Sequence, residues 1–599
     1  MATATEILHR TIPGGSFLIE ERSPEDIMTP EDFSEEQRQI ARTTTEFVRN
    51  EVLPNAEKIE AKQFDVTRAL LKKAGDLGLM AVDIPEAYGG LAMDKVTSAI
   101  VADHLSELAS FTVAFSAHVG IGTLPIVWYG TDAQKQKFLP RMATGELIGA
   151  YALSEATSGS DAMNIRTRAV LSDDGTHYLL NGEKMWISNA GFADLFTVFA
   201  KVDGDKFTAF LIEKGTPGLS IGSEEHKLGI RGSSTCPLVL SDCKVPVENL
   251  LGEVGKGHHI AFNILNIGRF KLGAACVGGA RTTLNHALGY AKQRQAFGKP
   301  IAAFGLVQQK LADAAARLFA VESMAYRTVG MIDDALGALE GEAAGNPREI
   351  QKNIEEYAVE CSILKVWGSE MLEVVVDHAV QIYGGYGYVE EYPVERAYRD
   401  SRINPIFEGT NEINRLIITG WLMKRALAGK LPLLASIKKL MDEVLEPPSF
   451  EEEADHTNDP LYAESQLLAS VKKLALFTAG AASQKYMNAL ADQQEVMADL
   501  ADIIIQVYAL ESALLRARKL RSRSLPLAAT AEAMVKLYAS KAMEIVELAS
   551  RRIVAAVAEG DTLRVQLAIV RRLSRHIPED VYATQRVIAT HLVDYGVWN

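Results

Sequence analysis

The chain has 599 residues, of which 48% are hydrophobic and 23% charged, and 62 basic against 77 acidic side chains give a formal net charge of −15. This composition is typical of a globular protein and excludes collagen-like, low-complexity and fully disordered chains. Because nonspecific nucleic-acid binding depends on Lys and Arg contacts to phosphates, the acidic balance also disfavours a nucleic-acid partner.

Cysteine usage and the first thirty residues bear on the compartment. The four cysteines form no C-x-x-C pair, and His258-His259 lacks the further ligands of a metal site, so we expect reduced thiols and no metal. Neither a signal peptide nor a transit peptide is evident. No uncharged apolar stretch of about 18 residues occurs, so no membrane span is expected. We therefore predict a cytoplasmic protein, or a mature form whose leader has been removed.

Periodicity divides the chain into segments. Residues 1–33 show little periodicity and are interpreted as an N-terminal extension. A capping box at Ser34 opens a helical pattern that extends over 34–147. Short β-branched and aromatic runs between turn residues predict a compact antiparallel β domain over 148–256. Helical periodicity returns over 257–430, so helices, strands and helices follow one another without alternating βαβ units. The predicted fold class is α+β, mostly α.

The last third of the chain contains a linker and a further helical region. Pro and acidic residues predict a linker over 431–460, and 461–599 is long enough to form an additional helical domain. The basic run 516–523 lies in that domain. The simpler interpretation is a solvated helix face, and the alternative is contact with an anionic membrane surface.

Four short motifs could bind a cofactor. Residues 151–161 run from a strand into a hydroxyl-rich loop whose amides can bind a phosphate or a polar ring edge. The tryptophan in 186–189 could cover a planar ring, and the glycines in 381–387 allow close backbone approach. Arg294 could bind a pyrophosphate, with Phe297 packing on a ring. Taken singly, each motif also fits a polar turn, a core tryptophan, a helix C-cap or a loop cation.

A candidate general base stands at Glu408. Phe407 and Gly409 flank it, and a carboxylate in such surroundings loses hydration, which raises its pKa. The alternative is a helix N-terminal acid that the helix dipole favours. Arg269 is likewise either an anion-binding residue or part of a solvated helix face.

In this order, the motifs LSEATSGSD, W-I-S-N, R-x-x-F-G, Q-x-x-G-G and F-E-G-T-N-E resemble the acyl-CoA dehydrogenase family over about residues 35–430. The tail resembles the family's very-long-chain branch. The resemblance implies an N-terminal helical domain, a central antiparallel β-barrel-like domain and a C-terminal four-helix bundle, plus an additional C-terminal helical domain. Ala156 stands where the family loop usually has Pro, and Asn266 replaces an acid found in some members.

The resemblance also implies FAD as the cofactor, Glu408 as the catalytic base and two further sets of residues. The residues implied to bind FAD are Tyr151, Leu153, Ser154, Ser160, Trp186, Ile187, Ser188, Arg294, Phe297, Gln308, Gln381, Gly384, Gly385, Thr410 and Glu412. The residues implied to face the acyl-CoA are Ser160, Phe262, Asn266, Arg269, Phe407 and Gly409. Among the FAD set, Arg294 and Gln381–Gly385 would act across a dimer interface.

The implied reaction is α,β-dehydrogenation of a long-chain fatty acyl-CoA, with electrons passed to electron-transfer flavoprotein. Gly120 and Gly122 could leave room for a long acyl tail, or else allow close helix packing. The tail domain predicts a homodimer, with peripheral membrane contact as a further partner hypothesis. Two alternative functions stay open: a non-catalytic assembly or scaffold protein, and an acyl-CoA oxidase on the same fold.

Overall fold

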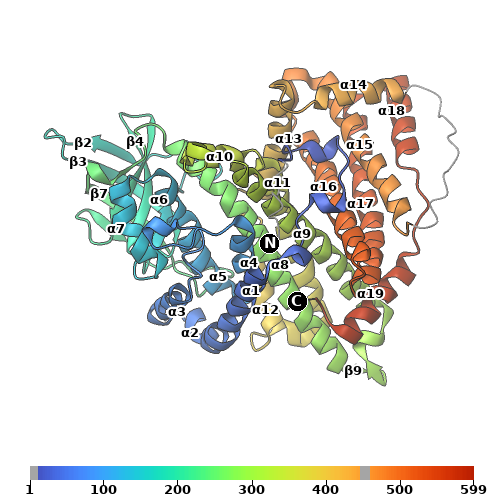
Figure 1. Cartoon of the computed structure of the whole chain (residues 1–599), viewed down its shortest axis with the longest axis horizontal. Helices are drawn as coiled ribbons and strands as arrows, with labels where there is room; N and C mark the ends of the chain where they lie inside the picture. Colours follow the sequence, from blue (N-terminus) through green and yellow to red (C-terminus); the bar gives the residue numbers. More distant parts are fainter. Residues whose placement is uncertain (1–10, 445–458, 599) are drawn as a thin grey trace, which may run out of the picture.

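The computed structural model describes residues 11–444 and 459–598, and its elements form three groups (Figure 1). Helices fill the first group, as the sequence pattern predicts. The Ser34 hydroxyl accepts a hydrogen bond from the Gln37 amide at 3.1 Å, and the Gln37 side chain accepts one from the Ser34 amide at 2.9 Å. This is the expected capping box. The helices are α1 (Glu35–Phe47), α2 (Ala56–Glu60), α3 (Phe64–Asp76), α4 (Lys95–His104), α5 (Ala109–Ser116), α6 (Leu124–Tyr129) and α7 (Asp132–Ala143).

A π-helical turn, η7 (Ala117–Gly122), separates α5 from α6. The two glycines of this turn have different surroundings. A Cβ atom added to Gly122 would lie 2.9 Å from the carbonyl carbon of Gly149, whereas one added to Gly120 would have no atom within 4 Å. Gly122 therefore allows close packing of the backbone, whereas Gly120 leaves open space beside the helix.

The second group is a twisted sheet with the strand order β6-β7-β3-β2-β4-β5-β8, drawn at the left of Figure 1. Most neighbours are antiparallel, but β1 and β2 both pair with β4 in parallel, which corrects the purely antiparallel expectation. The expected hairpin is present, with Asp203 and Gly204 at positive φ between β4 and β5. The strands are β1 (Gly149–Ala152), β2 (Arg168–Leu171), β3 (His177–Ser188), β4 (Leu195–Val202), β5 (Lys206–Glu213), β6 (Leu219–Ile221), β7 (Thr235–Pro246) and β8 (Leu250–Leu251).

Long helices build the third group. Its central member α8 has 37 residues and packs against α4, α9 and α11. A small hairpin, β9 (Gln295–Ala296) and β10 (Lys299–Pro300), projects after α8. The helices are α8 (Gly257–Gln293), α9 (Gly305–Gly337), α10 (Pro347–Glu355), α11 (Ala358–Tyr383), α12 (Pro393–Ser401) and α13 (Asn411–Leu427).

The C-terminal helices share one hydrophobic core with this bundle. Helices α16, α17 and α19 pack on α9, and α16 also packs on α13 (Figure 1). Part of the segment interpreted as a linker is helical, because Leu433 and Leu440 are buried on α14, which packs on α15; residues 445–458 lie outside the described part. The helices are α14 (Leu433–Glu443), α15 (Tyr462–Tyr486), α16 (Gln494–Ser522), α17 (Ala528–Val557), α18 (Gly560–Leu573) and α19 (Val581–Tyr595).

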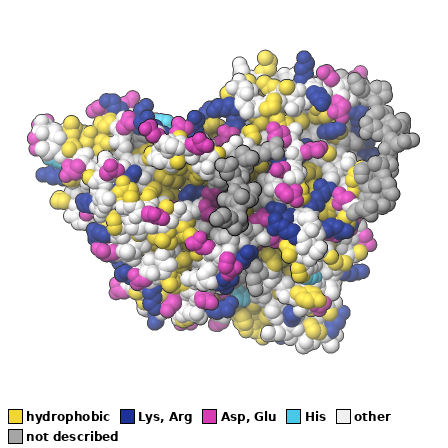
Figure 2. All heavy atoms as spheres, viewed as in Figure 1, with side chains coloured by type: hydrophobic (Ala, Val, Ile, Leu, Met, Phe, Trp, Pro, Cys, Tyr) yellow, Lys and Arg dark blue, Asp and Glu magenta, His cyan; other side chains and the backbone are white. Residues whose placement is uncertain are grey.

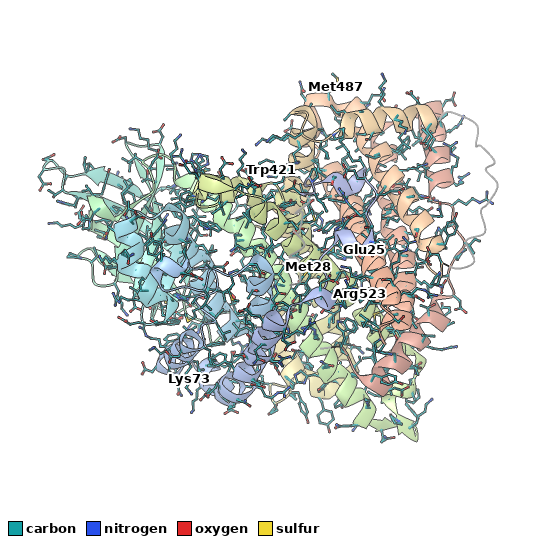
Figure 3. All side chains as sticks on the ribbon, viewed as in Figure 1. Glu25, Met28, Lys73, Trp421, Met487 and Arg523 are labelled. Atoms are coloured by element: carbon teal, nitrogen blue, oxygen red, sulfur yellow. The ribbon has the colours of Figure 1, made fainter. Side chains whose placement is uncertain are left out.

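The basic run of α16 is a solvated face only in part, since Arg521 and Arg523 are exposed. Arg516 and Lys519 are buried, and their partners are Glu31 at 2.7 Å and Asp32 at 2.6 Å in the N-terminal segment. The other cations of the run are paired with Asp459, Glu532 and Asp32. Figure 3 shows Glu25, Met28 and Arg523 of these two segments in the same region. The N-terminal extension therefore binds the tail.

Two helical stretches are long and apolar enough to meet a length and hydropathy test for membrane spans, contrary to the sequence expectation. They are Ala109–Tyr129 and Gly257–Gln293, and 83% and 67% of their most apolar windows are buried within the protein. Such burial is typical of core helices. The four cysteines are free and buried, as expected. Figure 2 shows acidic and basic side chains interspersed over the visible face.

Candidate active site

The carboxyl group of Glu408 opens on a cavity of about 340 Å³. Glu408 follows α12 in the loop that leads to α13, and its backbone is held at a φ of 57°. Such strain in a residue other than glycine persists only where the surroundings enforce it, and it is concentrated at functional sites. The Oε2 atom of Glu408 is buried without a hydrogen-bond partner among the described residues.

Burial raises the pKa of Glu408 from 4.5 to about 7, although the charges of Arg269 and Lys365 oppose the shift. A carboxyl group with a pKa near 7 is deprotonated in a substantial fraction at neutral pH and binds a proton well. Gly268 of α8 lies directly against this carboxyl group, since a Cβ atom at Gly268 would collide with Oε2. The site therefore fits a general base that works on a substrate in the cavity.

Three residues that sequence reasoning did not select hold the loop around Glu408. The Asn414 side-chain amide donates to the carbonyl oxygens of Gly409 at 2.8 Å and Thr410 at 3.1 Å. The Lys365 ammonium donates to the Asn411 side chain at 2.7 Å, and burial lowers the pKa of Lys365 to about 8. In the sequence, these three residues are distinguished only as polar side chains on helix faces that are otherwise apolar.

The cavity is a long channel. On α8 it is lined from Gly268 to His286, an axial distance of about 27 Å at 1.5 Å per residue. Residues 106–121, from the turn after α4 through α5 to η7, form the second wall, and residues 393–408 form the third. The open space beside Gly120 belongs to this channel. Most of the lining is apolar.

Part of the FAD set predicted from the sequence lies beside Glu408. Ser188, at the end of β3, lines the same cavity. Trp186 has a φ of 57° and is 56% exposed, so it is not the core tryptophan of the simpler interpretation, whereas Ile187 is buried. The Tyr151 hydroxyl is buried without a partner among the described residues, and burial together with the Glu408 charge raises the pKa of Tyr151 well above its usual value.

The loop after β1 is anchored by a buried ion pair. Glu155 accepts hydrogen bonds from Lys184 at 2.8 Å and from the Thr167 amide at 3.0 Å. Burial alone would raise the pKa of Glu155, but Lys184 and the other donors lower it. Leu153 and Ser154 are tied to β3 through their carbonyl oxygens, and Ser160 is exposed. This ion pair therefore fixes the loop directly beside Ala156, the position where the family usually has proline.

The remaining FAD residues lie in two places. Thr410 caps α13, where its hydroxyl accepts from the Ile413 amide at 3.3 Å, and Glu412 is exposed in the first turn. A second set is located at the far end of α8, about 37 Å along the helix axis from Arg269. This distal set is mostly exposed and contains Arg294, Phe297, Gln308, Gln381, Gly384 and Gly385. The chain therefore does not bring the two sets together within itself.

The residues predicted to face the acyl-CoA also differ in exposure. Phe262 is 43% exposed, whereas Asn266 and Arg269 are buried and hydrogen-bonded to each other at 2.8 Å. Phe407 lines the channel, and Gly409 has a φ of 81°, which favours glycine. Arg269 is thus a buried cation beside Glu408 and not a residue of a solvated helix face.

A second cavity, of about 710 Å³, opens beside the first turn of α8. Its lining includes Tyr129, Asn263 and three cations, Lys256, Arg348 and Lys352. The Tyr129 hydroxyl accepts a hydrogen bond from Asn263 at 3.0 Å. This polar cavity differs in character from the apolar channel. Among the described residues no group of three or more potential metal ligands is present.

A buried, unpartnered carboxyl group at one end of a long apolar channel defines an enzyme that performs acid–base chemistry on a substrate with an apolar chain. Four family models cover most of this chain: the N-terminal (residues 34–146), middle (150–243) and C-terminal (255–423) domains of acyl-CoA dehydrogenase, and a second C-terminal domain model (470–572). The chain belongs to the acyl-CoA dehydrogenase family and is an oxidoreductase.

Relatives extend over the whole chain. A protein of Bacillus subtilis (strain 168) described as "Probable acyl-CoA dehydrogenase" is 48% identical over 587 residues, which are 97% of either chain. The human mitochondrial very long-chain specific acyl-CoA dehydrogenase is 39% identical over 57% of this chain and 51% of that protein. A crystal structure of acyl-CoA dehydrogenase complexed with FAD from Bacillus anthracis has a TM-score of 0.95 at 47% identity, covering 98% of this chain and 100% of that chain.

The raised pKa of Glu408 predicts the pH dependence of turnover. Because the base must be deprotonated, kcat/KM for an acyl-CoA is expected to rise about tenfold per pH unit below pH 7 and to level off above it. Initial rates with an artificial electron acceptor between pH 5 and pH 9 measure the profile. A profile that is flat from pH 5 to pH 7 would contradict the assignment of Glu408 as a base with this pKa.

Proposed function

We propose that this protein is an FAD-dependent dehydrogenase of long-chain fatty acyl-CoA, which it converts to trans-2-enoyl-CoA. The observation that carries the proposal is the position of the Glu408 carboxyl group at one end of the channel along α8. The acyl chain occupies the channel, with its α carbon beside Glu408. FAD, when bound, would accept the hydride that leaves the β carbon.

The residues around Glu408 account for proton removal. Glu408 takes the α proton, and its low solvation keeps it basic enough to do so near neutral pH. An α C–H bond is acidic only if the thioester carbonyl is polarised. The backbone N–H of Glu408 has no hydrogen-bond partner among the described residues, so it can donate to that oxygen.

The residues near the channel fit a flavin. Ser188 lines the channel with Glu408, and the exposed Trp186 is free to cover a planar ring. In the distal set, Cβ atoms added to Gly384 and Gly385 would meet no atom within 4 Å, so the backbone there is open to a ligand. These observations, together with the FAD complex of the Bacillus anthracis relative, support FAD as the cofactor.

The separation of the two sets supports a homodimer. Arg294 lies 5.8 Å above the Tyr386 ring, which brings the ends of α8 and α11 together on an exposed surface, and Phe297 is 95% exposed. In the proposal, the distal set of one protomer completes the FAD site around Glu408 of its partner.

Electron-transfer flavoprotein is the proposed electron acceptor. The proposed position of the CoA moiety is the polar cavity, beside Lys256 and Arg348.

Channel length supports long acyl chains. Carbon–carbon bonds of about 1.5 Å at tetrahedral angles advance an extended chain by about 1.25 Å per carbon, so about 27 Å accommodates chains of about 16 to 20 carbons. Gly279 lies on the channel wall about 16 Å along α8 from Gly268. A Cβ atom there would make only ordinary contacts, at 3.7 Å or more, so a side chain can begin at this position without backbone displacement.

Shortening the channel tests the proposal. The variant Gly279→Leu is expected to retain turnover of octanoyl-CoA and to lose about two orders of magnitude in kcat/KM for eicosanoyl-CoA, whose twenty-carbon chain extends about 6 Å beyond Gly279. Each methylene group excluded from the channel forfeits about 0.8 kcal/mol, and four of them suffice. The control Gly289→Leu is on the same helix but outside the channel, with open space around its Cβ atom. Equal losses for both substrates in Gly279→Leu would refute the long-chain assignment.

A further inference from the structure

The far end of the acyl channel is polar. Three ionisable side chains line it: Glu107 after α4, His286 on α8 and Arg396 on α12. They come from all three walls of the channel at the end opposite Glu408. A channel that served only hydrocarbon chains would gain by ending in apolar side chains, because partly buried charges lose hydration.

The charges at this end are not neutralised by direct pairing. No hydrogen bond or ion pair joins the side chain of Arg396 or of Glu107 to another described residue. Burial raises the pKa of Glu107, an effect that Arg49 and Arg396 oppose, and burial together with Arg396 lowers the pKa of His286. Glu107, His286 and Arg396 line the same cavity, and the charge of Arg396 acts on the other two side chains. Asp400 also lines the cavity, but it is paired with Arg399 at 3.6 Å and accepts a hydrogen bond from the Ile230 amide. Arg396 is therefore a channel-lining cation whose side chain has no direct carboxylate partner among the described residues.

We propose that this end binds the ω-carboxylate of dicarboxylic acyl-CoA substrates, with Arg396 as the residue that determines this specificity. The inference rests on the proposed function, since it concerns the same channel. An ω-carboxylate inside an apolar channel is costly unless a cation and hydrogen-bond donors meet it. The Arg396 guanidinium supplies a charged fork suited to a carboxylate, and the His286 ring supplies a neutral donor.

The length of the channel sets the length of the diacid. With about 1.25 Å per carbon, the ω-carboxyl carbon of a sixteen-carbon chain lies about 18 Å from the α carbon, and that of a twelve-carbon chain about 12 to 13 Å. Arg396 is located near His286, about 27 Å along α8 from Gly268, which leaves about 9 Å to the ω-carboxyl carbon of the sixteen-carbon chain. An extended arginine side chain and an ion-pair separation of up to about 4 Å span this distance. Hexadecanedioyl-CoA therefore suits the site, whereas dodecanedioyl-CoA is too short.

The test measures kcat/KM of the FAD-loaded enzyme for hexadecanedioyl-CoA and palmitoyl-CoA, with dodecanedioyl-CoA as the length control. Wild type is expected to use hexadecanedioyl-CoA within about tenfold of palmitoyl-CoA. The variant Arg396→Met should lower the ratio of the two sixteen-carbon values at least tenfold, because it removes a charge-assisted hydrogen bond. Arg396→Lys should recover part of the ratio, and the ratio for dodecanedioyl-CoA should change much less.

Two further variants keep the test decisive. Glu107→Gln removes the opposing carboxylate and should raise the ratio several-fold. Arg402→Met, at an exposed cation that does not line the channel, should leave the ratio unchanged. If palmitoyl-CoA is oxidised but hexadecanedioyl-CoA is not, or if Arg396→Met leaves the ratio unchanged, the inference is wrong and the proposed function stands. If neither sixteen-carbon substrate is oxidised, the proposed function fails and the inference fails with it.

Discussion

The variant Glu408→Gln is expected to lower the rate of acyl-CoA oxidation by about 10² to 10⁴ fold, the range that general-base catalysis contributes. The amide cannot accept the α proton, but it has nearly the same shape, so FAD content and acyl-CoA affinity should change little. Stopped-flow reduction of the flavin by palmitoyl-CoA measures the rate. A fall of less than about tenfold would show that another group removes the proton.

Glu360→Gln is the matched control for this variant. Burial also raises the pKa of Glu360 to about 7, but its carboxyl group accepts a hydrogen bond from the Gly15 amide at 2.7 Å and does not line the channel. Turnover should therefore persist in Glu360→Gln. Loss of turnover in both variants would point to a general effect of removing a buried acid.

Glu408 also has an expected cost in stability. Its pKa is higher in the folded state than in the unfolded state, so the folded state binds more protons between about pH 4.5 and pH 7, and stability falls as pH rises through that window. Above pH 7 the cost reaches about 3 kcal/mol. Glu408→Gln should consequently be more stable than wild type at pH 8 and not at pH 4, as measured by chemical unfolding.

The second large effect is expected at Arg516. Its guanidinium is 1% exposed and bonds to Glu322 at 2.5 Å and Glu31 at 2.7 Å, and the Trp598 indole also donates to Glu322 at 2.6 Å. The network joins α9, α16, the N-terminal segment and the C-terminus. Burial alone would raise the pKa of Glu322, but Arg516 and Arg281 lower it to about 2, so the pair is charged at neutral pH.

Removing this cation leaves Glu31 without its guanidinium partner and leaves Glu322 with Arg281 and the Trp598 indole alone. Arg516→Ala is expected to lower the free energy of unfolding by about 3 to 5 kcal/mol, seen as a lower denaturant midpoint at pH 7. The control Arg523→Ala removes a half-exposed partner of Asp32 and should cost about 1 kcal/mol or less. An Arg516→Ala midpoint equal to that of Arg523→Ala would show that the network does not hold the tail and the N-terminal segment on the bundle.

The sequence predicted the order of the helical and β segments because periodicity and capping are local properties. The capping box at Ser34 and the hairpin at Asp203 appear where the pattern placed them. The flanking residues of Glu408 correctly indicated a desolvated carboxyl group. Lys365 and Asn414 were missed because their roles depend on contacts between α11, the catalytic loop and α13.

Other features depend on partners far away in the chain. The basic run of α16 resembles a solvated face in sequence, and only the fold brings Glu31 to Arg516. Gly120 and Gly122 are indistinguishable in the sequence, yet one faces the channel and the other packs on β1. The polar end of the channel likewise arises from three separate helical regions, so no local pattern indicates it.

The most direct test of the central claim is anaerobic mixing of the FAD-loaded enzyme with palmitoyl-CoA while the visible absorbance of the flavin is recorded. The position of Glu408 on a channel that fits about 16 to 20 carbons predicts rapid loss of the flavin absorbance and formation of trans-2-hexadecenoyl-CoA. Bound FAD whose absorbance stays unchanged with straight-chain acyl-CoA substrates of every length would contradict the account.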